Sequence, residues 1–282
     1  MSQNSFSWLC PSCRQPLHHS SRSWTCIKGH QFDCAKEGYV NLMLAQHKNS
    51  KQPGDSKAMV AARRSFLESG NYAPLANKMA EILLANISTD AHSHKPFALF
   101  DAGCGEGYYL NYVQAHVAPK LGVVESSGVD ISKFAVQKAA KQYKELHFAV
   151  ASTYAIPVAD DSQDLLIQVF APSSDEEVHR IIKPGGFWLR VNPAADHLHQ
   201  LKALVYDKPK AHDMKVSSPQ GFKKIVTERL RFNVSLDDRQ SRESLLMMTP
   251  FYWQISEQKK AHLLAHLQQV EADFLIELFQ TC

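Results

Sequence analysis

Short apolar runs alternate with helix-length spacers through the middle of the chain. Each run is rich in β-branched and aromatic residues, which favours a short buried strand. The spacers at 133–143 and 175–182 carry helical patterns of apolar positions. Strands that alternate with helices predict an α/β fold with a doubly wound, mostly parallel sheet. The five predicted strands cover 96–100, 127–132, 147–152, 164–170 and 183–191.

A glycine-rich turn, Asp101-Ala-Gly-Cys-Gly-Glu-Gly107, follows the first predicted strand and leads into a predicted helix. Glycine lacks a Cβ atom, so the turn can be tight and a nucleotide-like ligand can approach the main chain. No Lys-Ser/Thr pair follows, which argues against a triphosphate-binding loop. The acidic residues suit a ligand with an ammonium group or ribose hydroxyls, such as S-adenosylmethionine. We assign these residues to a cofactor site: Asp101, Gly103, Gly105, Glu106 and Gly107.

The second predicted strand carries Asp130, and a Lys183-Pro-Gly-Gly sequence opens the fifth. An acidic residue roughly 20 to 30 residues after a glycine turn is placed to hydrogen-bond a ribose. Together these elements resemble the class I S-adenosylmethionine-dependent methyltransferases over about residues 95–280, which implies a Rossmann-like domain. A nicotinamide-binding domain or an inactive relative is the alternative, and the agreement of several elements in order and spacing favours the methyltransferase.

The first thirty residues contain a Cys/His pattern of the form C-x2-C-x12-C-x3-H, made by Cys10, Cys13, Cys26 and His30. Two close cysteines and a distant Cys/His pair complete the tetrahedron of a structural zinc site, with no position left for a catalytic water. Cys34 is a possible substitute ligand. Free thiols or a redox pair are the alternatives, but a redox Cys-x-x-Cys usually lies in a thioredoxin-like context that is absent here. We therefore expect a small N-terminal zinc-binding domain that depends on its metal for folding.

The next segment predicts two helices. Pro53-Gly54 marks a turn, and Asp55-Ser56 marks a helix cap. Apolar positions at helical spacing then predict a helix that ends near Gly70, and a second helix over 75–85. Residues 90–95 are polar and predict a linker.

Composition narrows the class of protein. The chain has 282 residues, 44% hydrophobic and 21% charged, which is ordinary for a globular protein. We expect no membrane span, because no apolar run approaches about 18 residues. The N-terminus lacks a basic region followed by an apolar stretch, so no secretory signal is expected. Six cysteines without clear pairing favour the reducing cytoplasm.

The net charge of +3 is distributed unevenly. Residues 1–64 carry nine Lys/Arg and three Asp/Glu, which gives +6, and the remaining residues carry 22 and 25, which gives −3. This asymmetry hints that the N-terminal quarter meets a polyanion, although a solvated basic face explains it equally well. Its basic residues include Lys28, Lys36, Lys48, Lys51, Arg63 and Arg64.

Several motifs together resemble one family. The zinc pattern, Lys-Glu-Gly-Tyr-Val-Asn-Leu, Pro-Gly-Asp-Ser, Ala-Arg-Arg-x-Phe-Leu and Asp-x-Gly-Cys-Gly-Glu-Gly-Tyr-Tyr occur in this order. Nearly end to end, the chain resembles the bacterial 23S ribosomal RNA (guanine-N1)-methyltransferases that act on a hairpin loop of domain II, the guanine-745 enzymes. The resemblance implies a homodimer with no membrane association. It also implies an RNA-recognising zinc module over 1–50, a helical connector to the cofactor site over 51–95 and a methyltransferase domain over 96–282.

The resemblance also implies further contacts to S-adenosylmethionine. Besides the glycine turn, that family holds the cofactor through a tyrosine before the first strand, which corresponds to Tyr72. The Tyr-Tyr pair after the turn takes part as well, as does a histidine after the fifth strand. In this chain these residues are Tyr108, Tyr109, the adjacent Leu110, and His197.

The chain also limits the methyl acceptor. Methylation of a pyrimidine ring carbon needs a nucleophilic cysteine after the fourth strand, where this chain has Phe170-Ala-Pro-Ser173. Methylation of an exocyclic amine typically uses an Asp/Asn-Pro-Pro-aromatic loop there, and only one proline is present. A ring nitrogen stays possible and needs a proton acceptor, for which Glu106, Asp175 and Asp196 are candidates. Phe170 and Pro172 are candidates for stacking an unstacked base, with core packing as the alternative for Phe170.

Two other functions remain open at this point. One is a small-molecule methyltransferase with a zinc-stabilised lid, and the other is a non-catalytic RNA-binding relative. The intact acidic and glycine positions argue against the loss of cofactor binding.

Overall fold

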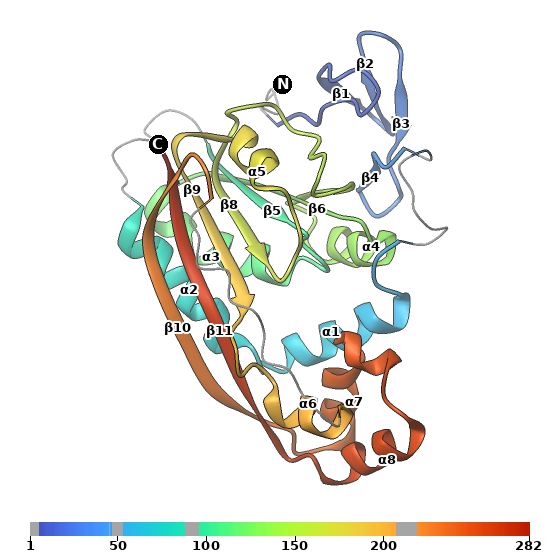
Figure 1. The fold of residues 1–282 in the computed structure, drawn as a ribbon. Helices are drawn as coiled ribbons and strands as arrows, with labels where there is room; N and C mark the ends of the chain where they lie inside the picture. Colours follow the sequence, from blue (N-terminus) through green and yellow to red (C-terminus); the bar gives the residue numbers. More distant parts are fainter. Residues whose placement is uncertain (1–5, 45, 47–52, 88–95, 207–218) are drawn as a thin grey trace.

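The structure is a computed structural model that describes residues 6–44, 46, 53–87, 96–206 and 219–282. An eight-stranded sheet forms its centre, in the order β10-β11-β9-β8-β5-β6-β7-β4 (Figure 1). All five predicted strands are confirmed and pair in parallel. They are β5 (Phe97–Ala102), β6 (Val124–Asp130), β7 (His147–Val150), β8 (Gln163–Val169) and β9 (Ile182–Pro193). The predicted linker at 90–95 lies outside the described residues.

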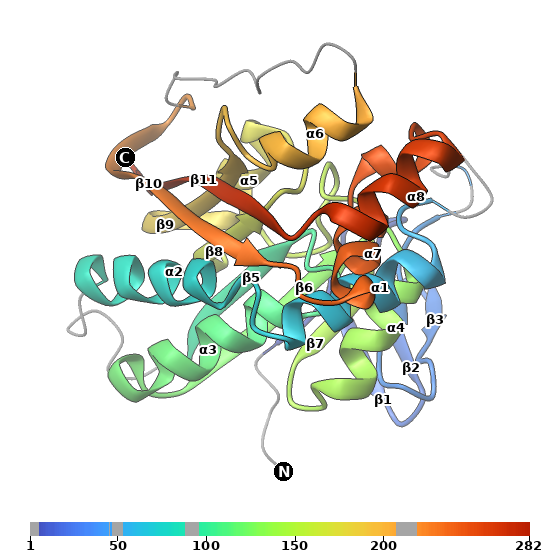
Figure 2. The ribbon, with the colours of Figure 1, turned by 90° about the horizontal axis from the view of Figure 1, so that it is seen from below.

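The middle strands are buried on both faces, which explains their nearly continuous apolar sequences. On β8, Leu165, Ile167 and Val169 pack into one core, and Leu166 packs into the other. Helices cover the two faces: α2 and α3 lie on one side of the sheet and α5 on the other (Figure 2). These helices are α2 (Ala73–Asn86), α3 (Tyr108–Leu121), α4 (Lys133–Gln142) and α5 (Asp175–Ile181).

Two long strands after the parallel set complete one edge of the sheet. β10 (Phe222–Ser235) and β11 (Gln269–Thr281) pair antiparallel with each other, and β11 pairs antiparallel with β9. The sheet is therefore mostly parallel with an antiparallel edge. The sequence does not predict this pair, because β10 alternates exposed with half-buried positions and lacks a strong apolar run.

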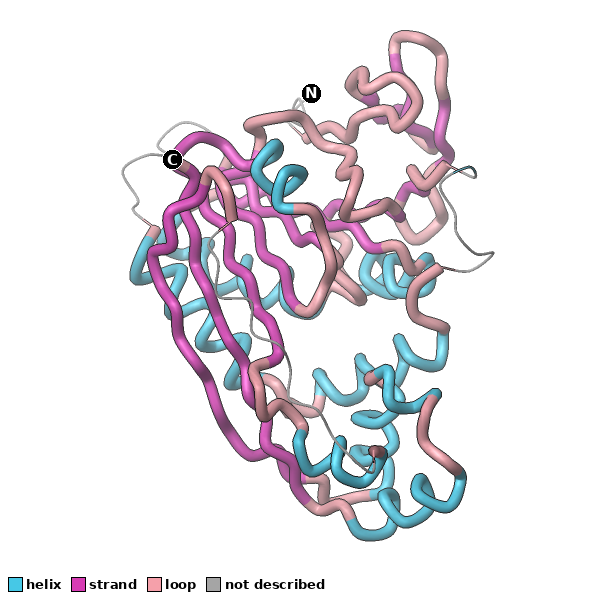
Figure 3. The backbone as a smooth tube through the Cα atoms, in the orientation of Figure 1, coloured by secondary structure: helices cyan, strands magenta, loops and turns pink. Residues whose placement is uncertain are grey.

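Helices gather beyond the carboxyl ends of the parallel strands (Figure 3). The predicted connector helix is confirmed as α1 (Lys57–Glu68), where the Ser56 hydroxyl accepts a hydrogen bond from the Met59 N–H and caps the first turn. The second connector helix is α2, and both helices come before β5 in sequence. The remaining helices are α6 (His199–Val205), α7 (Arg239–Met247), the 3-10 helix η2 (Pro250–Trp253) and α8 (Glu257–His266).

The N-terminal segment forms a small ribbon that packs on the central sheet. Its three antiparallel strands are β1 (Leu17–Ser20), β2 (Ser23–Cys26) and β3 (Gln31–Asp33). The chain then enters the large sheet as β4 (Val40–Asn41), parallel to β7. Trp8 and Trp24 share a buried apolar cluster with Trp188. The ribbon therefore has apolar support from the sheet in addition to any metal.

Candidate active site and metal centre

The predicted metal ligands come together in the ribbon. One ligand atom from each of Cys10, Cys13, Cys26 and His30 lies within 4.8 Å of the others. The Cys13 and Cys26 sulfurs are 3.7 Å apart, and the His30 Nδ1 atom lies 3.5 Å from the Cys10 sulfur and 3.3 Å from the Cys26 sulfur. A tetrahedral zinc ion with bonds of about 2.3 Å to sulfur and 2.0 Å to nitrogen has edges of about 3.5–3.8 Å. The donor set therefore fits a structural zinc ion.

The backbone prepares one of these cysteines for a metal. Burial raises the pKa of the Cys26 thiol, but hydrogen bonds from the backbone of His30 and Lys28 outweigh it and lower the pKa to about 6. The thiolate is the form that ligates zinc. Cys34, the possible substitute ligand, is not part of the cluster among the described residues, and burial raises the pKa of its thiol.

The glycine turn connects β5 to α3 in a conformation that glycine favours. Gly103 has φ +85°, and a Cβ atom placed there would lie 2.3 Å from the Cβ atom of Ala171. Gly107 has φ +86° and packs against the Tyr143 ring, where a Cβ atom would lie 2.9 Å away. The turn is thus pressed between the loop after β8 and the helix after β6.

Asp130 at the end of β6 holds the turn from the other side. Its carboxylate accepts hydrogen bonds from the Gly105 N–H at 3.0 Å and from the Ser132 N–H at 2.7 Å. Burial raises the pKa of Asp130, and these two N–H groups lower it in part. Burial, together with the negative charge of Asp130, raises the pKa of Asp101 well above its usual range. Two buried carboxyls of this kind favour a cationic ligand, because a positive charge restores their ionised form.

A cavity of about 670 Å³ opens beside the turn at the carboxyl edge of the sheet. The glycine turn, α1, the loops after β7 and β8, and the segment before α8 all contribute to its walls. Most of the predicted cofactor residues line it: Tyr72, Asp101, Gly103, Gly105, Glu106, Tyr108, Tyr109, Asp130 and His197. Gly107 and Leu110 do not. Gly107 packs on Tyr143, and Leu110 is buried in the core against Gly128.

Several polar atoms on the cavity wall are buried without a hydrogen-bond partner in the described structure. They include the hydroxyls of Tyr72 and Tyr109 and both carboxylate oxygens of Glu106. Burial raises the pKa of both tyrosines, so both hydroxyls keep their protons at neutral pH. The ammonium and carboxylate groups of S-adenosylmethionine offer the missing partners: the tyrosines can donate and the acidic residues can accept. The cavity therefore fits this cofactor.

His197 lies on the cavity wall beside Phe170 and Phe274, with ring centroids 6.2 Å and 4.8 Å away. Its Nδ1 atom accepts a hydrogen bond from the Asp273 N–H at 3.2 Å. In the neutral ring the proton therefore sits on Nε2. This tautomer makes His197 a hydrogen-bond donor at Nε2.

The candidate proton acceptors have different surroundings. Asp175 is exposed in the first turn of α5, and it does not line the cavity. Asp196 also lies outside the cavity lining, where it pairs with Arg229 at 3.0 Å and Arg231 at 2.6 Å. Glu106 lines the cavity, and its carboxylate lies 3.4 Å from the Arg64 guanidinium. Geometry therefore retains only Glu106 of the three.

Two basic residues expected on the charged surface turn inward instead. Arg63 pairs with Asp55 on the cavity wall, and Arg64 pairs with Glu68 and Glu106. The Arg64 side chain is only 13% exposed. Both guanidinium groups form ion pairs within the protein, because α1 packs against the glycine turn. Lys48 and Lys51 lie outside the described residues.

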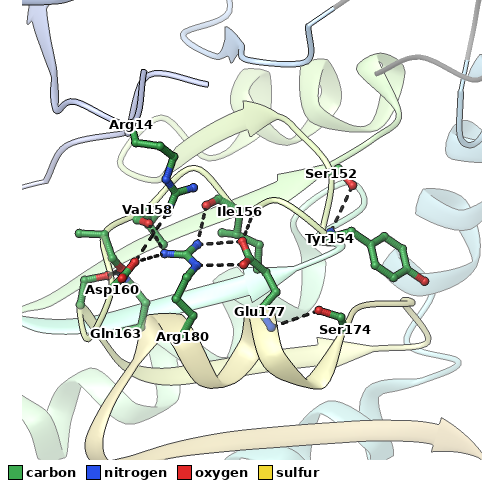
Figure 4. Close-up of polar contacts among 12 residues, drawn as sticks. Arg14, Ser152, Tyr154, Ile156, Val158, Asp160, Gln163, Ser174, Glu177 and Arg180 are labelled. Carbon is green, nitrogen blue, oxygen red and sulfur yellow. Dashed lines mark hydrogen bonds and ion pairs between the residues drawn. The ribbon is translucent and has the colours of Figure 1, made fainter. Parts of the chain in front are cut away.

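Sequence reasoning missed Tyr154 on the loop 152–162, which lines the cavity. Figure 4 shows how this loop is held: the Arg180 guanidinium donates to the carbonyls of Ile156 and Val158 and forms a two-bond pair with Glu177. The ribbon holds the same loop, since the Leu9 N–H donates to the Pro157 carbonyl at 2.7 Å. No local sequence pattern marks the contacts of this loop with Arg180 and Leu9, which come from distant segments.

Sequence reasoning also missed the segment between α7 and α8. Met248, Thr249, Pro250, Phe251 and Trp253 line the cavity from this segment. A composition cue existed, because the four residues of η2 include three aromatic rings. The sequence alone does not place them next to a turn about 140 residues earlier.

Comparisons with known proteins identify the family. The family described as "RlmA, N-terminal", a zinc ribbon, matches residues 8–51, and the family described as "Methyltransferase domain" matches residues 99–186. The chain is 33% identical to the 23S rRNA (guanine(748)-N(1))-methyltransferase of Streptomyces fradiae, over 97% of this chain and 95% of that protein. The chain belongs to the 23S rRNA (guanine-N1)-methyltransferase family. A Bacillus subtilis relative, the putative 23S rRNA (guanine-N(1)-)-methyltransferase YxjB, is 32% identical over 86% of both chains.

The family membership agrees with the fold and with the donor sets. The class I methyltransferase fold with a zinc ribbon, S-adenosylmethionine and structural zinc, all predicted from the sequence, are confirmed. In the part of the chain that the structure describes, no helix is long and apolar enough to cross a membrane.

Proposed function

We propose that this protein transfers a methyl group from S-adenosylmethionine to N1 of one guanine in a hairpin loop of 23S rRNA, at the position known as guanine-745. One observation carries the proposal. The same chain contains a complete zinc ribbon and a cavity whose buried tyrosine hydroxyls and Glu106 oxygens lack hydrogen-bond partners in the described structure. The relatives' names support a guanine N1 acceptor. The choice of position rests on the sequence resemblance.

We divide the cavity wall into two sides according to the residues that line it. Asp101, Glu106, Tyr72 and Tyr109 supply buried polar groups, and we assign this side to the cofactor. S-adenosylmethionine supplies an electrophilic methyl group when bound. The loop after β8 supplies Phe170 and forms the other side, to which we assign the target base.

The acceptor nitrogen of guanine carries a proton that must leave. His197 does not suit the role of base, because its Nε2 atom carries the proton in the neutral ring. It can instead donate a hydrogen bond to guanine O6, which gains negative charge as the N1 proton leaves. Glu106 belongs to the cofactor side and pairs with Arg64, so we assign the N1 proton to a water molecule. Alignment of the reacting atoms supplies much of the rate.

The wider organisation also belongs to this proposal. The protein works as a homodimer in the cytoplasm, with residues 1–50 recognising RNA, 51–95 supplying cofactor contacts and 96–282 carrying the catalytic domain. The contributions of α1 and Tyr72 to the cavity support the role of the connector. Sedimentation of the purified protein tests the dimer.

Transfer of a tritiated methyl group tests the function. The substrate is ribosomal RNA from a strain that lacks the enzyme, and the control is RNA from the parent strain, which already carries the modification. Methyl transfer to the first RNA alone supports the proposal. A protein that binds S-adenosylmethionine but ignores RNA points to a small-molecule methyltransferase. Binding of RNA without cofactor binding points to a non-catalytic relative.

A further inference from the structure

The aromatic side chains most exposed to solvent gather at one cavity. Among the described residues, the exposed large aromatic side chains are Tyr154, Phe170 and Trp253, with exposed fractions of 58%, 41% and 68%. All three line the cavity beside the glycine turn. They come from three separate segments: the loop after β7, the loop after β8, and η2. Exposed apolar rings are costly in water, so such a cluster marks a binding surface.

Backbone conformation and hydrogen bonds hold two of these rings in exposed positions. Phe170 has φ +56°, which is uncommon for a large residue, and its N–H is held by the Val191 carbonyl at 3.0 Å. Trp253 ends η2, whose turn is closed by hydrogen bonds from the Gln254 and Ile255 N–H groups to the Phe251 carbonyl. The Tyr252 ring meets Trp253 edge to face, with centroids 5.1 Å apart. Trp253 is therefore held in an exposed position by ordered structure.

The chemistry of the rings indicates the ligand. Enzymes that modify a base in RNA take it out of the stack and receive it on aromatic side chains. We assign the cofactor to other residues of the cavity wall, among them Asp101 and Tyr109. We propose that Trp253 stacks on the target guanine once the base has left the hairpin loop, with Phe170 as the inner wall of this base site. This inference rests on the proposed function.

The exposure of Trp253 provides a readout that does not depend on activity. The chain has four tryptophans, and the other three, Trp8, Trp24 and Trp188, are at most 7% exposed. Fluorescence that is accessible to a soluble quencher such as acrylamide therefore reports on Trp253. The ligands are a synthetic 23S rRNA hairpin that the wild type methylates, and the same hairpin with an abasic site at the target position. We expect the intact hairpin to lower the fluorescence of Trp253 by stacking and to shield the ring from acrylamide. The abasic hairpin should have both effects to a much smaller extent.

Kinetics provide the second arm. Loss of one base stack in Trp253→Leu should lower kcat/KM for the hairpin by about 10- to 100-fold. Trp253→Phe should recover much of this loss, because it retains a ring. Cofactor affinity should stay within about twofold of the wild type. Val123→Ser is the matched control, since it removes another exposed apolar side chain, 73% exposed and outside the cavity lining.

Each other outcome contradicts the assignment. If S-adenosylmethionine alone protects Trp253, the ring belongs to the cofactor site. If the abasic and intact hairpins quench equally, Trp253 contacts the RNA backbone or lies outside the base site. If Trp253→Leu methylates the hairpin like Val123→Ser, Trp253 does not stack on the base. A wild-type protein that methylates no RNA would instead refute the proposed function itself.

Discussion

The metal centre and the cofactor cavity differ in how completely the chain satisfies them. In the ribbon, four ligand atoms lie within 4.8 Å of one another and match a tetrahedral ion without further groups. In the cavity, tyrosine hydroxyls and the Glu106 oxygens are buried with no hydrogen-bond partner among the described residues, and only the Arg64 guanidinium lies near Glu106. A structural site is thus closed by its own chain, whereas a site that takes a substrate leaves polar groups unsatisfied until the ligand arrives.

The two regions are nevertheless physically joined. The ribbon holds the loop 152–162 through Leu9 and Pro157, and Arg14 lies 3.7 Å from Asp160 on the same loop. Arg180 holds this loop from α5, and Tyr154 extends from it (Figure 4). We therefore expect damage to the ribbon to affect the side of the cavity assigned to the target base first, and the cofactor side less.

The largest effect is expected from breaking the metal centre. Cys13→Ser should lose the zinc ion, which contributes on the order of 10 kcal/mol to the folding of small zinc modules. We expect faster amide exchange in the first fifty residues and RNA methylation reduced more than 100-fold. Cofactor affinity should change only a few-fold. Elemental analysis, exchange mass spectrometry and calorimetry measure the three quantities.

Cys34→Ser is the control, because Cys34 lies outside the metal cluster. It should retain one zinc per chain. Wild-type protein that holds no zinc when expressed with ample metal would refute the structural zinc site, and equal loss of cofactor and RNA functions in Cys13→Ser would refute the separation of the two regions.

A smaller effect is expected from Asp101→Asn, which tests the cofactor side of the cavity. Loss of a charge-assisted hydrogen bond should weaken S-adenosylmethionine binding by about 1.5–3 kcal/mol, as measured by calorimetry. Asp130→Asn should weaken binding through a second route, because Asp130 also anchors the turn at Gly105. Affinity equal to that of the wild type in both variants would show that these carboxylates do not contact the cofactor.

The pH dependence follows from the raised pKa of Asp101. As pH falls through this raised pKa, the carboxyl is protonated and S-adenosylmethionine affinity should fall, a dependence that Asp101→Asn should lack. The stability of the ligand-free fold should depend on pH in the opposite direction. The folded state binds the proton more tightly than the unfolded state, so the ligand-free protein loses stability as pH rises through the folded pKa. At neutral pH the ligand-free Asp101→Asn variant should therefore melt at a higher temperature than the wild type.

The smallest effect concerns the basic surface of the ribbon. Lys28 is exposed, and the Lys36 side chain is 89% exposed. If both contact phosphates, the Lys28→Ala/Lys36→Ala variant should lower the salt slope of RNA binding by roughly 0.7–0.9 per contact. Lys223→Ala, an exposed position on β10, should leave the slope unchanged. A wild-type slope in the double variant would exclude these two lysines from the RNA surface.

Features that depend on local pattern could be predicted from the sequence. The five parallel strands, the Ser56 cap and the four zinc ligands each rest on spacing within one segment. Features that depend on distant contacts could not. β4 has only two residues, and its place in the sheet comes from pairing with β7. Trp253 lies in η2, which contacts α7, and α7 packs against α1 on the cavity wall; Arg64 leaves the basic surface because Glu106 is nearby.

Identification of the methylated atom tests the central claim most directly. Ribosomal RNA from a strain that lacks the enzyme is treated with the purified protein and S-adenosylmethionine, then analysed by nucleoside mass spectrometry and primer extension. N1 methylation blocks the pairing edge of guanine, so we expect 1-methylguanine and one new stop next to guanine-745. A methyl group on another base or on another atom of guanine would contradict the proposed reaction, and 1-methylguanine at a different position would refute the assigned target.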